Sequence, residues 1–316
     1  RLAKGADLKF ETPMFKNFLV GTNYDFLGKR KWAYIFSCCT IVFGLISFFT
    51  KGFEMGVDFK GGRDYKVRFE KNINTTALKS DLDATFGGGT VVKTYGQDNQ
   101  IKASTSYRVA EQGETVDLDA ETKLYEGCKK YLNGASFETF KSKNLMSSTK
   151  VAPTISAAIK STSILAAALA LAAMFIYILI RFKKWQYSMG AIAATAHDTL
   201  FVLAIFSIFS NILPFSLEID QAFIAAILTV IGYSINDTVI VFDRLREYLA
   251  EDPKSRIAGV CNKAINSTLT RTFNTSLTTI FVVIVLFIFG GEAIRGFSFA
   301  LILGIAIGTY SSIFIA

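Results

Sequence analysis

Six apolar runs, each long enough to cross a lipid bilayer, constrain this chain more than any other feature of its sequence. A bilayer core about 30 Å thick needs roughly 20 helical residues, because each residue advances the helix by about 1.5 Å. Runs of that length with few charges cover residues 32–50, 161–180, 187–210, 222–242, 269–289 and 297–316. Hydrophobic residues make up 51% of the chain, and their concentration in these runs predicts a multi-pass α-helical membrane protein.

The lysines and arginines beside these runs predict the orientation of the chain. They cluster before the first run, between the second and third, and between the fourth and fifth: Lys29, Arg30, Lys31, Arg181, Lys183, Lys184, Arg244, Arg246, Lys254, Arg256 and Lys263. Because basic loops stay in the cytoplasm, we expect both termini to be cytoplasmic and residues 53–160 to lie outside. The net charge of +8 then reflects topology, and no nucleic-acid partner is expected.

Residues 53–160 are mostly polar, and their pattern indicates a folded domain. Alternation predicts strands over residues 64–70, 90–95 and 100–105, with a turn at 97–99 and a returning strand over 149–155. Helices are predicted over 75–86, capped by Asn74 or Thr75, and over 120–132. The order β-α-β-β-α-β predicts a small α+β ferredoxin-like domain. Its single cysteine, Cys128, leaves it without an internal disulfide.

Two ionisable residues inside the apolar runs are the strongest candidates for function. A charge within a span costs about 2.5–3.5 kcal/mol on insertion scales, so it needs a partner or a watery cavity. Asp237 and Arg271 both lie about 9 Å deep on consecutive antiparallel helices, and we expect them to form an ion pair. Since arginine stays protonated, Asp237 is the member that can exchange a proton under the membrane potential. A static pair that only fixes helix packing is the alternative.

Polar residues around this pair recur at helical spacing, which favours an interior, hydrated site. The two stripes are Ser267, Arg271, Asn274, Thr275 and Thr278 on the fifth span, and Tyr233, Ser234 and Asp237 on the fourth. In the third span, His197 and Asp198 are adjacent and point about 100° apart, so we do not expect them to face one site in the same way. Asp198 is the better candidate for a proton relay, whereas His197 also fits a packing or interhelical hydrogen-bonding role.

The sequence carries no pattern typical of an enzyme. Gly61 and Gly62, like glycines 87–89, lack the following lysine and serine or threonine of a phosphate loop. One histidine excludes a histidine-rich metal site, and no Ser-His-Asp or HExxH arrangement occurs. We therefore expect no cofactor, no metal and no covalent chemistry. Gly304 and Gly308 form a GxxxG pair, which is typical of close helix packing.

Five stretches, in order along the chain, resemble the SecF family of protein-export membrane proteins. They are residues 56–62 (GVDFKGG), 196–198 (AHD), 230–244 (VIGYSINDTVIVFDR), 266–272 (NSTLTRT) and 308–312 (GTYSS). The resemblance implies six helices that form half of a twelve-helix bundle related to RND transporters. It aligns Asp237 and Arg271 with the family's essential intramembrane pair. It also implies a structural or coupling role for Asp58, Gly61, Gly62 and Asn236.

The same resemblance implies an accessory subunit of the Sec translocase in the bacterial inner membrane, which uses the proton gradient to promote polypeptide export. The implied partners are a SecD half or subunit, the SecYEG channel, YajC, YidC, the unfolded polypeptide and membrane lipid. Residues 1–28 are expected to be a cytoplasmic linker in a fused SecDF, although a separate SecF with a trimmed start has the same sequence features. Half of a small-molecule RND-type exporter and a non-transporting scaffold for Sec subunits are also compatible with this pattern of spans.

In the mechanism that we expect, protonation of Asp237 breaks its pairing with Arg271 and the helices repack. The outer domain, residues 53–160, then swings about the junctions at residues 53–62 and 151–160. The first span with its flanks covers residues 29–52, and residues 161–316 hold the remaining five.

Overall fold

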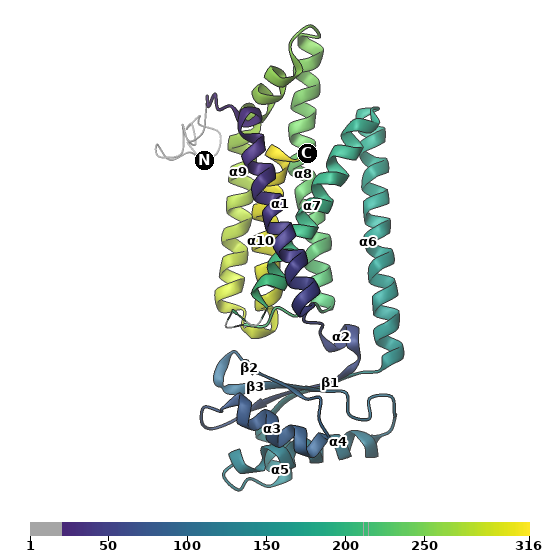
Figure 1. Cartoon of the computed structure of the whole chain (residues 1–316), viewed down its shortest axis with the longest axis vertical. Coiled ribbons are helices and arrows are strands. Elements are labelled where there is room, and N and C mark those ends of the chain that lie inside the picture. Colours follow the sequence, from purple (N-terminus) through teal and green to yellow (C-terminus); the bar gives the residue numbers. More distant parts are fainter. Residues whose placement is uncertain (1–20, 211, 214) are drawn as a thin grey trace, which may run out of the picture.

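Six long helices stand on one side of a small antiparallel sheet in the computed structural model (Figure 1). The structure describes residues 21–210, 212–213 and 215–316, so residues 1–20 of the expected linker lie outside it. The long helices are α1 (Phe26–Lys51), α6 (Pro153–Phe182), α7 (Trp185–Phe209), α8 (Gln221–Glu251), α9 (Ile257–Phe289) and α10 (Glu292–Phe314). Within the described residues, these six are long and apolar enough to cross a membrane, which confirms the six predicted spans.

Three helices extend well beyond the predicted runs, and one of them, α9, begins at Ile257, twelve residues before its expected start. Helix α6 begins at Pro153, eight residues before the expected start, because proline at the first helical position fixes φ and loses no internal hydrogen bond there. The predicted strand over 149–155 was therefore too long and ends at Val151. Helix α8 continues to Glu251 through the charged residues that follow the apolar run.

The segment between α1 and α6 folds as predicted, in the order β1 (Gly62–Arg68), α3 (Thr75–Phe86), β2 (Val91–Tyr95), β3 (Gln97–Thr105), α4 (Glu114–Cys128) and β4 (Leu145–Val151). The strand order is β2-β3-β1-β4, and all neighbours are antiparallel, which confirms the ferredoxin-like domain. The side chain of Asn74 caps α3 by accepting hydrogen bonds from the amides of Thr76 and Ala77. Short turns complete the segment: α2 (Val57–Lys60), η1 (Lys129–Tyr131), α5 (Phe137–Thr139) and η2 (Phe140–Asn144).

Two local predictions in this domain were wrong. The turn between β2 and β3 is at Gly96, which adopts φ +76°, and residues 97–99 belong to β3. Glycine reaches this backbone conformation without steric cost, so one residue suffices where three were expected. Helix α4 begins at Glu114 instead of residue 120.

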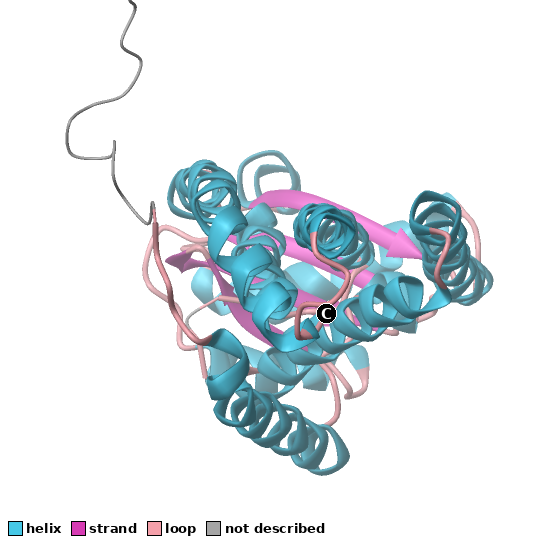
Figure 2. Ribbon diagram, turned by 90° about the horizontal axis from the view of Figure 1, so that it is seen from above, coloured by secondary structure: helices cyan, strands magenta, loops and turns pink. Residues whose placement is uncertain are grey.

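The domain buries one face of its sheet and turns the other towards the bundle. Inward residues of β1 and β3 pack against residues of α3 and α4. The strands contribute Tyr65, Val67, Ile101 and Ala103, and the helices contribute Leu78, Leu82, Ala120, Leu124 and Cys128. Figure 1 shows α3 and α4 on the far side of the sheet from the long helices, and Figure 2, viewed down the bundle, shows the strands crossing beneath them. Because side chains alternate along a strand, the polar residues of β1, β2 and β3 face the ends of the long helices.

The burial of Cys128 predicts an unreactive thiol. It is fully buried, and burial raises the pKa of its thiol to about 12. In a variant without the other cysteines (Cys38, Cys39 and Cys261), a maleimide should label Cys128 about a thousandfold more slowly than a Val91→Cys control in the exposed part of β2. Labelling kinetics by mass spectrometry measure this ratio, and equal rates would contradict the packing of α4 on the sheet.

The GxxxG pair packs α10 closely on α8, as predicted. A Cβ on Gly304 would overlap Cγ2 of Val230, and one on Gly308 would lie 3.0 Å from Cβ of Ser234. Gly304→Val should therefore destabilise the bundle by about 1–3 kcal/mol through overpacking. Gly232→Ala on the open side of α8 is the control, since a Cβ there meets nothing within 4 Å. Thermal unfolding in detergent compares the two, and equal midpoints would refute the close approach.

Candidate functional site

Asp237 lies where α8 meets α9 and α10, and its side chain is fully buried. Ser276 Oγ of α9 donates a long hydrogen bond of 3.4 Å to Asp237 Oδ2, and the same hydroxyl is 2.5 Å from Thr309 Oγ1 of α10. Asp237 Oδ1 has no hydrogen-bond partner among the described residues. An ionised carboxylate with so few donors is costly in an apolar interior. This position can therefore respond strongly to the arrival or loss of a proton.

The expected ion pair between Asp237 and Arg271 is absent. Among the residues that the structure describes, no ion pair joins the two side chains. Thr272 and Ser276 are the buried residues of α9 at this level, whereas Arg271 is exposed. Each residue turns an α-helix by about 100°, so Arg271 lies on a different side of α9 from the buried Thr272 and Ser276. The depth prediction placed both residues at one level but left the rotation of α9 undetermined.

Arg271 instead belongs to a polar stripe on the outside of α9. The members of this α9 polar stripe are all exposed: Ser267, Arg271, Asn274, Thr275 and Thr278. Asn236 is exposed on the neighbouring helix α8. Such side chains are unfavourable against lipid and typically face protein or water. The stripe therefore indicates that this side of the bundle faces protein or water instead of lipid.

Asp198 joins three helices at the centre of the bundle. Its carboxylate accepts hydrogen bonds from Ser234 Oγ of α8 at 2.5 Å and from Ser311 Oγ of α10 at 2.8 Å. His197 Nδ1 lies 2.9 Å from its other oxygen, so the two neighbours are in contact, although Asp198 is buried and His197 is only partly so. The rings of Phe201 and Tyr310 flank the imidazole, and this packing turns it towards Asp198.

The residues of the glycine-rich motif connect the sheet to α8. Asp58 Oδ2 accepts a hydrogen bond of 3.1 Å from the amide of Gln221, the first residue of α8. Gly61 and Gly62 have φ values of +73° and +150°, which favour glycine. A Cβ on Gly62 would lie 3.1 Å from the carbonyl oxygen of Thr105. The motif thus forms the tight turn between α2 and β1, and its aspartate caps the helix that carries Asp237.

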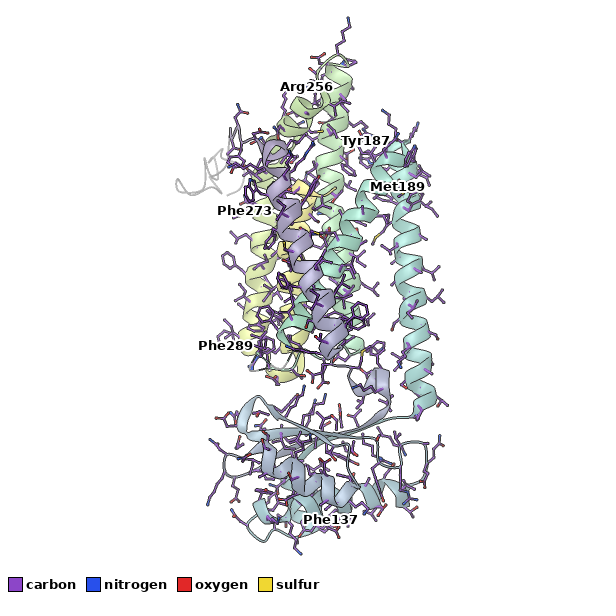
Figure 3. All side chains as sticks on the ribbon, viewed as in Figure 1. Phe137, Tyr187, Met189, Arg256, Phe273 and Phe289 are labelled. Carbon is purple, nitrogen blue, oxygen red and sulfur yellow. The ribbon has the colours of Figure 1, made fainter. Side chains whose placement is uncertain are left out.

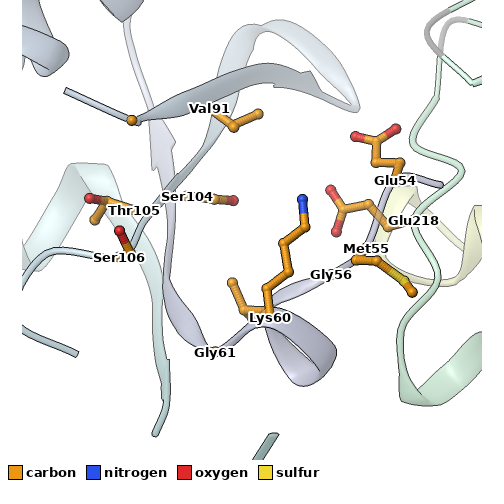
Figure 4. Close-up of a pocket in the computed structure, with 12 residues that line it drawn as sticks. Glu54, Met55, Gly56, Lys60, Gly61, Val91, Ser104, Thr105, Ser106 and Glu218 are labelled. Atoms are coloured by element: carbon orange, nitrogen blue, oxygen red, sulfur yellow. The ribbon is translucent and has the colours of Figure 1, made fainter. Parts of the chain in front are cut away.

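A cleft of about 450 Å³ separates the sheet from the bundle beside this motif. Figure 4 shows Glu54 and Glu218 on the bundle side of the cleft and Ser104 and Lys60 on the other side. Glu54 is paired with Lys93, and Glu218 with Lys102. Within the described residues, no group of three or more histidine, cysteine or acidic side chains is placed to hold a metal ion. No local pattern in the sequence predicts these two pairs, because each joins residues from distant polar segments.

Comparison with known proteins shows which families this chain resembles. The family model "Protein export membrane protein SecD/SecF, C-terminal" matches residues 132–316, and "SecD/SecF GG Motif" matches residues 46–73. The chain is 44% identical over 294 residues to the protein translocase subunit SecF of Rhodothermus marinus, covering 93% of this chain and 91% of that protein. It is 34% identical to the SecF subunit of Vibrio alginolyticus, covering 96% and 90% of the two chains.

Solved structures of SecDF share the fold. The crystal structure of SecDF, a translocon-associated membrane protein from Thermus thermophilus, superposes with a TM-score of 0.78 at 29% identity. A second crystal structure, of SecDF in a super-membrane-facing form, gives a TM-score of 0.61 at 27% identity. Each match covers 94% of this chain but 38% of the SecDF chain.

Proposed function

This chain belongs to the SecF family of Sec translocase subunits, and we propose that it couples the proton gradient to polypeptide export through Asp237. The observation that carries the proposal is the burial of this carboxylate at the junction of α8, α9 and α10, with one long hydrogen bond to Oδ2 and none to Oδ1 among the described residues. In this proposal the chain carries out no covalent chemistry and hydrolyses no ATP.

A proton on Asp237 changes which groups at this junction donate hydrogen bonds. The ionised carboxylate can only accept, so it competes with Thr309 Oγ1 and with the Thr272 carbonyl, 2.9 Å away, for the hydroxyl proton of Ser276. The protonated carboxyl can donate, and Ser276 is then free to bond to Thr309. Because these two hydroxyls belong to α9 and α10, the two protonation states favour different packing of three helices. Moving one charge through 100 mV supplies about 2.3 kcal/mol, enough to bias such an equilibrium.

Arg271 acts in this proposal from the outer face of α9, beside a companion six-helix half. The α9 polar stripe is exposed in this chain, and the SecDF chain, of which the match covers 38%, contains further sequence that could form this companion. We therefore propose that a SecD half or subunit covers the stripe. The SecYEG channel, YajC, YidC and the unfolded polypeptide remain partners predicted from the family.

Photocrosslinking tests the companion. A benzophenone side chain introduced at Thr278, within the stripe, should form an adduct with SecD in native membranes. The same probe at Leu165 is the control, since this residue of α6 is exposed among apolar neighbours and should react mainly with lipid. Equal yields of SecD adduct at the two positions would contradict the assignment of the stripe.

The distribution of charge supports the proposed orientation in the bacterial inner membrane. The three basic clusters lie at the end of the bundle opposite the sheet, where Figure 3 labels Arg256, while Phe289 lies at the sheet end. By the preference of basic loops for the cytoplasm, we propose cytoplasmic termini and a periplasmic ferredoxin-like domain. The apolar outer faces of α1, α6 and α9, exposed in this chain, fit contact with lipid.

Export into inverted membrane vesicles tests the proposed function. A radiolabelled preprotein is translocated with and without an imposed proton gradient, in vesicles that contain or lack this chain. The chain should increase the protected fraction only when the gradient is present. Stimulation that is equal with and without the gradient would instead support a scaffold for Sec subunits.

A further inference from the structure

Three lysines form a row across the face of the sheet that points at the bundle. In the strand register, Lys102 of β3 lies between Lys93 of β2 and Lys66 of β1. Like charges directly opposite on neighbouring strands are destabilising, so the row needs compensation. Lys66 lies over the ring of Tyr95 at 4.7 Å. The other two lysines are paired with carboxylates.

Acidic residues at the ends of the long helices meet the lysine row. Lys102 Nζ is 2.5 Å from Glu218 Oε2, in the connection between α7 and α8, and 3.0 Å from Asp64 Oδ2 of β1. Lys93 pairs with Glu54, which follows α1. The side chains of Lys102 and Glu218 are only 16% and 13% exposed. Solvent and salt therefore screen this pair much less than a surface pair.

The environment keeps the Lys102–Glu218 pair ionised. Burial alone would raise the pKa of Glu218, but the ammonium groups of Lys102 and Lys93 hold it below its ordinary value. Burial would lower the pKa of Lys102, yet Glu218 and Asp64 raise it above its ordinary value. Asp64 itself has a raised pKa because of its burial, although Lys102 and Ser104 oppose the shift. The pair is thus present at neutral pH; it is lost as the pH falls through the lowered pKa of Glu218 and as the pH rises through the raised pKa of Lys102.

Glu218 lies three residues before α8, in a segment that is bonded to the connection after α1. The amide of Ile219 donates to the carbonyl of Glu54 at 2.7 Å, and the amide of Gly56 donates to the carbonyl of Ile219 at 2.9 Å. Asp220 then caps α8 by accepting from the amide of Phe223 at 2.8 Å. Asp237 lies further along the same helix, about 24 Å from its start at 1.5 Å per residue. A displacement of α8 at the level of Asp237 therefore moves Glu218.

Clefts on both sides make this pair a principal contact between the sheet and the bundle. One cleft, of about 450 Å³, includes Glu218 and Ser104 in its wall, and Figure 4 shows it opening beside Glu218. A second, of about 100 Å³, lies between Lys66 and Glu292 and also reaches Lys102 and Glu218. Among the described residues, two ion pairs cross from the face of the sheet to the ends of the long helices, Lys93–Glu54 and Lys102–Glu218, and only the second reaches the segment that leads into α8.

We propose that Lys102 and Glu218 form a strut that transmits movement of α8 to the ferredoxin-like domain. The strut rests on the proposed function, since it assumes that Asp237 drives α8. It differs from a swing about the two chain connections, because the force passes through a side-chain contact between β3 and the start of α8. The carboxylate of Asp64 and the hydroxyl of Ser104, 2.5 Å apart, position Lys102 for this contact.

Removing and then replacing the strut tests it. The double variant Lys102→Met with Glu218→Gln should lower gradient-driven export about tenfold, a typical size for a coupling effect. The double variant Lys102→Cys with Glu218→Cys, in a background without Cys38, Cys39 and Cys261, should be equally weak. Closing it with a short bismaleimide should restore export to near the wild-type level. Restoration by the crosslinker also shows that the variant is folded.

The control is the exposed ion pair Arg108–Glu111 within the domain, whose double replacement by glutamine should leave export unchanged. Full export by the neutral double variant, or no recovery on crosslinking, overturns the strut. If wild-type vesicles show gradient-driven export in the same experiment, either of these two results refutes the strut and leaves the proposed function intact. If they show none, the proposed function fails, and the strut fails with it.

Discussion

Replacing Asp237 by asparagine should reduce export in the presence of a proton gradient to the level seen without one, while the chain stays inserted and folded. Asparagine has nearly the same shape and can still accept a hydrogen bond from Ser276, so the packing of α8 should survive. It cannot gain or lose a proton, so the two packing arrangements no longer differ in their response to the gradient. Inverted vesicles with equal amounts of each variant measure the effect.

Asp243→Asn is the matched control for this experiment. Asp243 lies on the same helix and pairs with Arg181 and Arg246 near its charged end, where its side chain is 27% exposed. Its loss should cost little, because exposed ion pairs contribute about 0–1 kcal/mol. Undiminished gradient-driven export by Asp237→Asn would remove the central residue from the mechanism.

Replacing Asp198 by alanine should produce the largest loss of stability among the single substitutions considered. The change leaves the hydroxyls of Ser234 and Ser311 and the imidazole of His197 without their shared acceptor. Each buried polar group left unpaired costs about 1–3 kcal/mol. The unfolding midpoint in detergent should fall clearly below that of Thr199→Val, whose hydroxyl bonds only within its own helix. Matching midpoints would show that the three-helix junction contributes little.

Asp198→Asn separates a relay from a purely structural junction. The amide keeps an oxygen to accept from the serine hydroxyls, so most of the stability should return. If Asp198 is the relay residue that the sequence predicts, however, Asp198→Asn loses its exchangeable proton, and gradient-driven export should fall. A folded Asp198→Asn variant with full export would leave Asp198 a structural role only.

The features that sequence predicted well are those with local physical causes. Span number follows from the length of apolar runs, and the cap of α3 follows from one asparagine side chain and two nearby amides. The order of strands and helices in the domain follows from the apolar residues, which recur at every second position in strands and at about every 3.6 positions in helices. Close packing at Gly304 and Gly308 follows from their spacing of one helical turn.

The features that it missed depend on contacts between distant segments. Residue counts place Asp237 and Arg271 at one depth, but the rotation of α9 is set by the burial of Thr272 and Ser276. The strut joins residues 116 positions apart, and neither segment carries a periodic signal. The contact between His197 and Asp198 depends on how α10 packs around the imidazole.

The position of Arg271 also changes how a charge exchange should be interpreted. Asp237→Arg with Arg271→Asp would place a guanidinium in a fully buried site with few acceptors and a carboxylate on an exposed face. A buried unpaired charge is strongly destabilising, so this variant should fail to fold whether or not Asp237 titrates. Single conservative substitutions are therefore the better test of the two residues.

The most direct test of the account is whether Asp237 changes its protonation state in the working protein. Infrared difference spectra of the chain with its companion half, recorded in lipid between acidic and alkaline pH, report protonated carboxyl groups by their C=O stretch. We expect a carboxyl band that appears on acidification in the wild type and is missing from Asp237→Asn. A band of equal intensity in both proteins, or no protonation-dependent band in the wild type, would contradict the account.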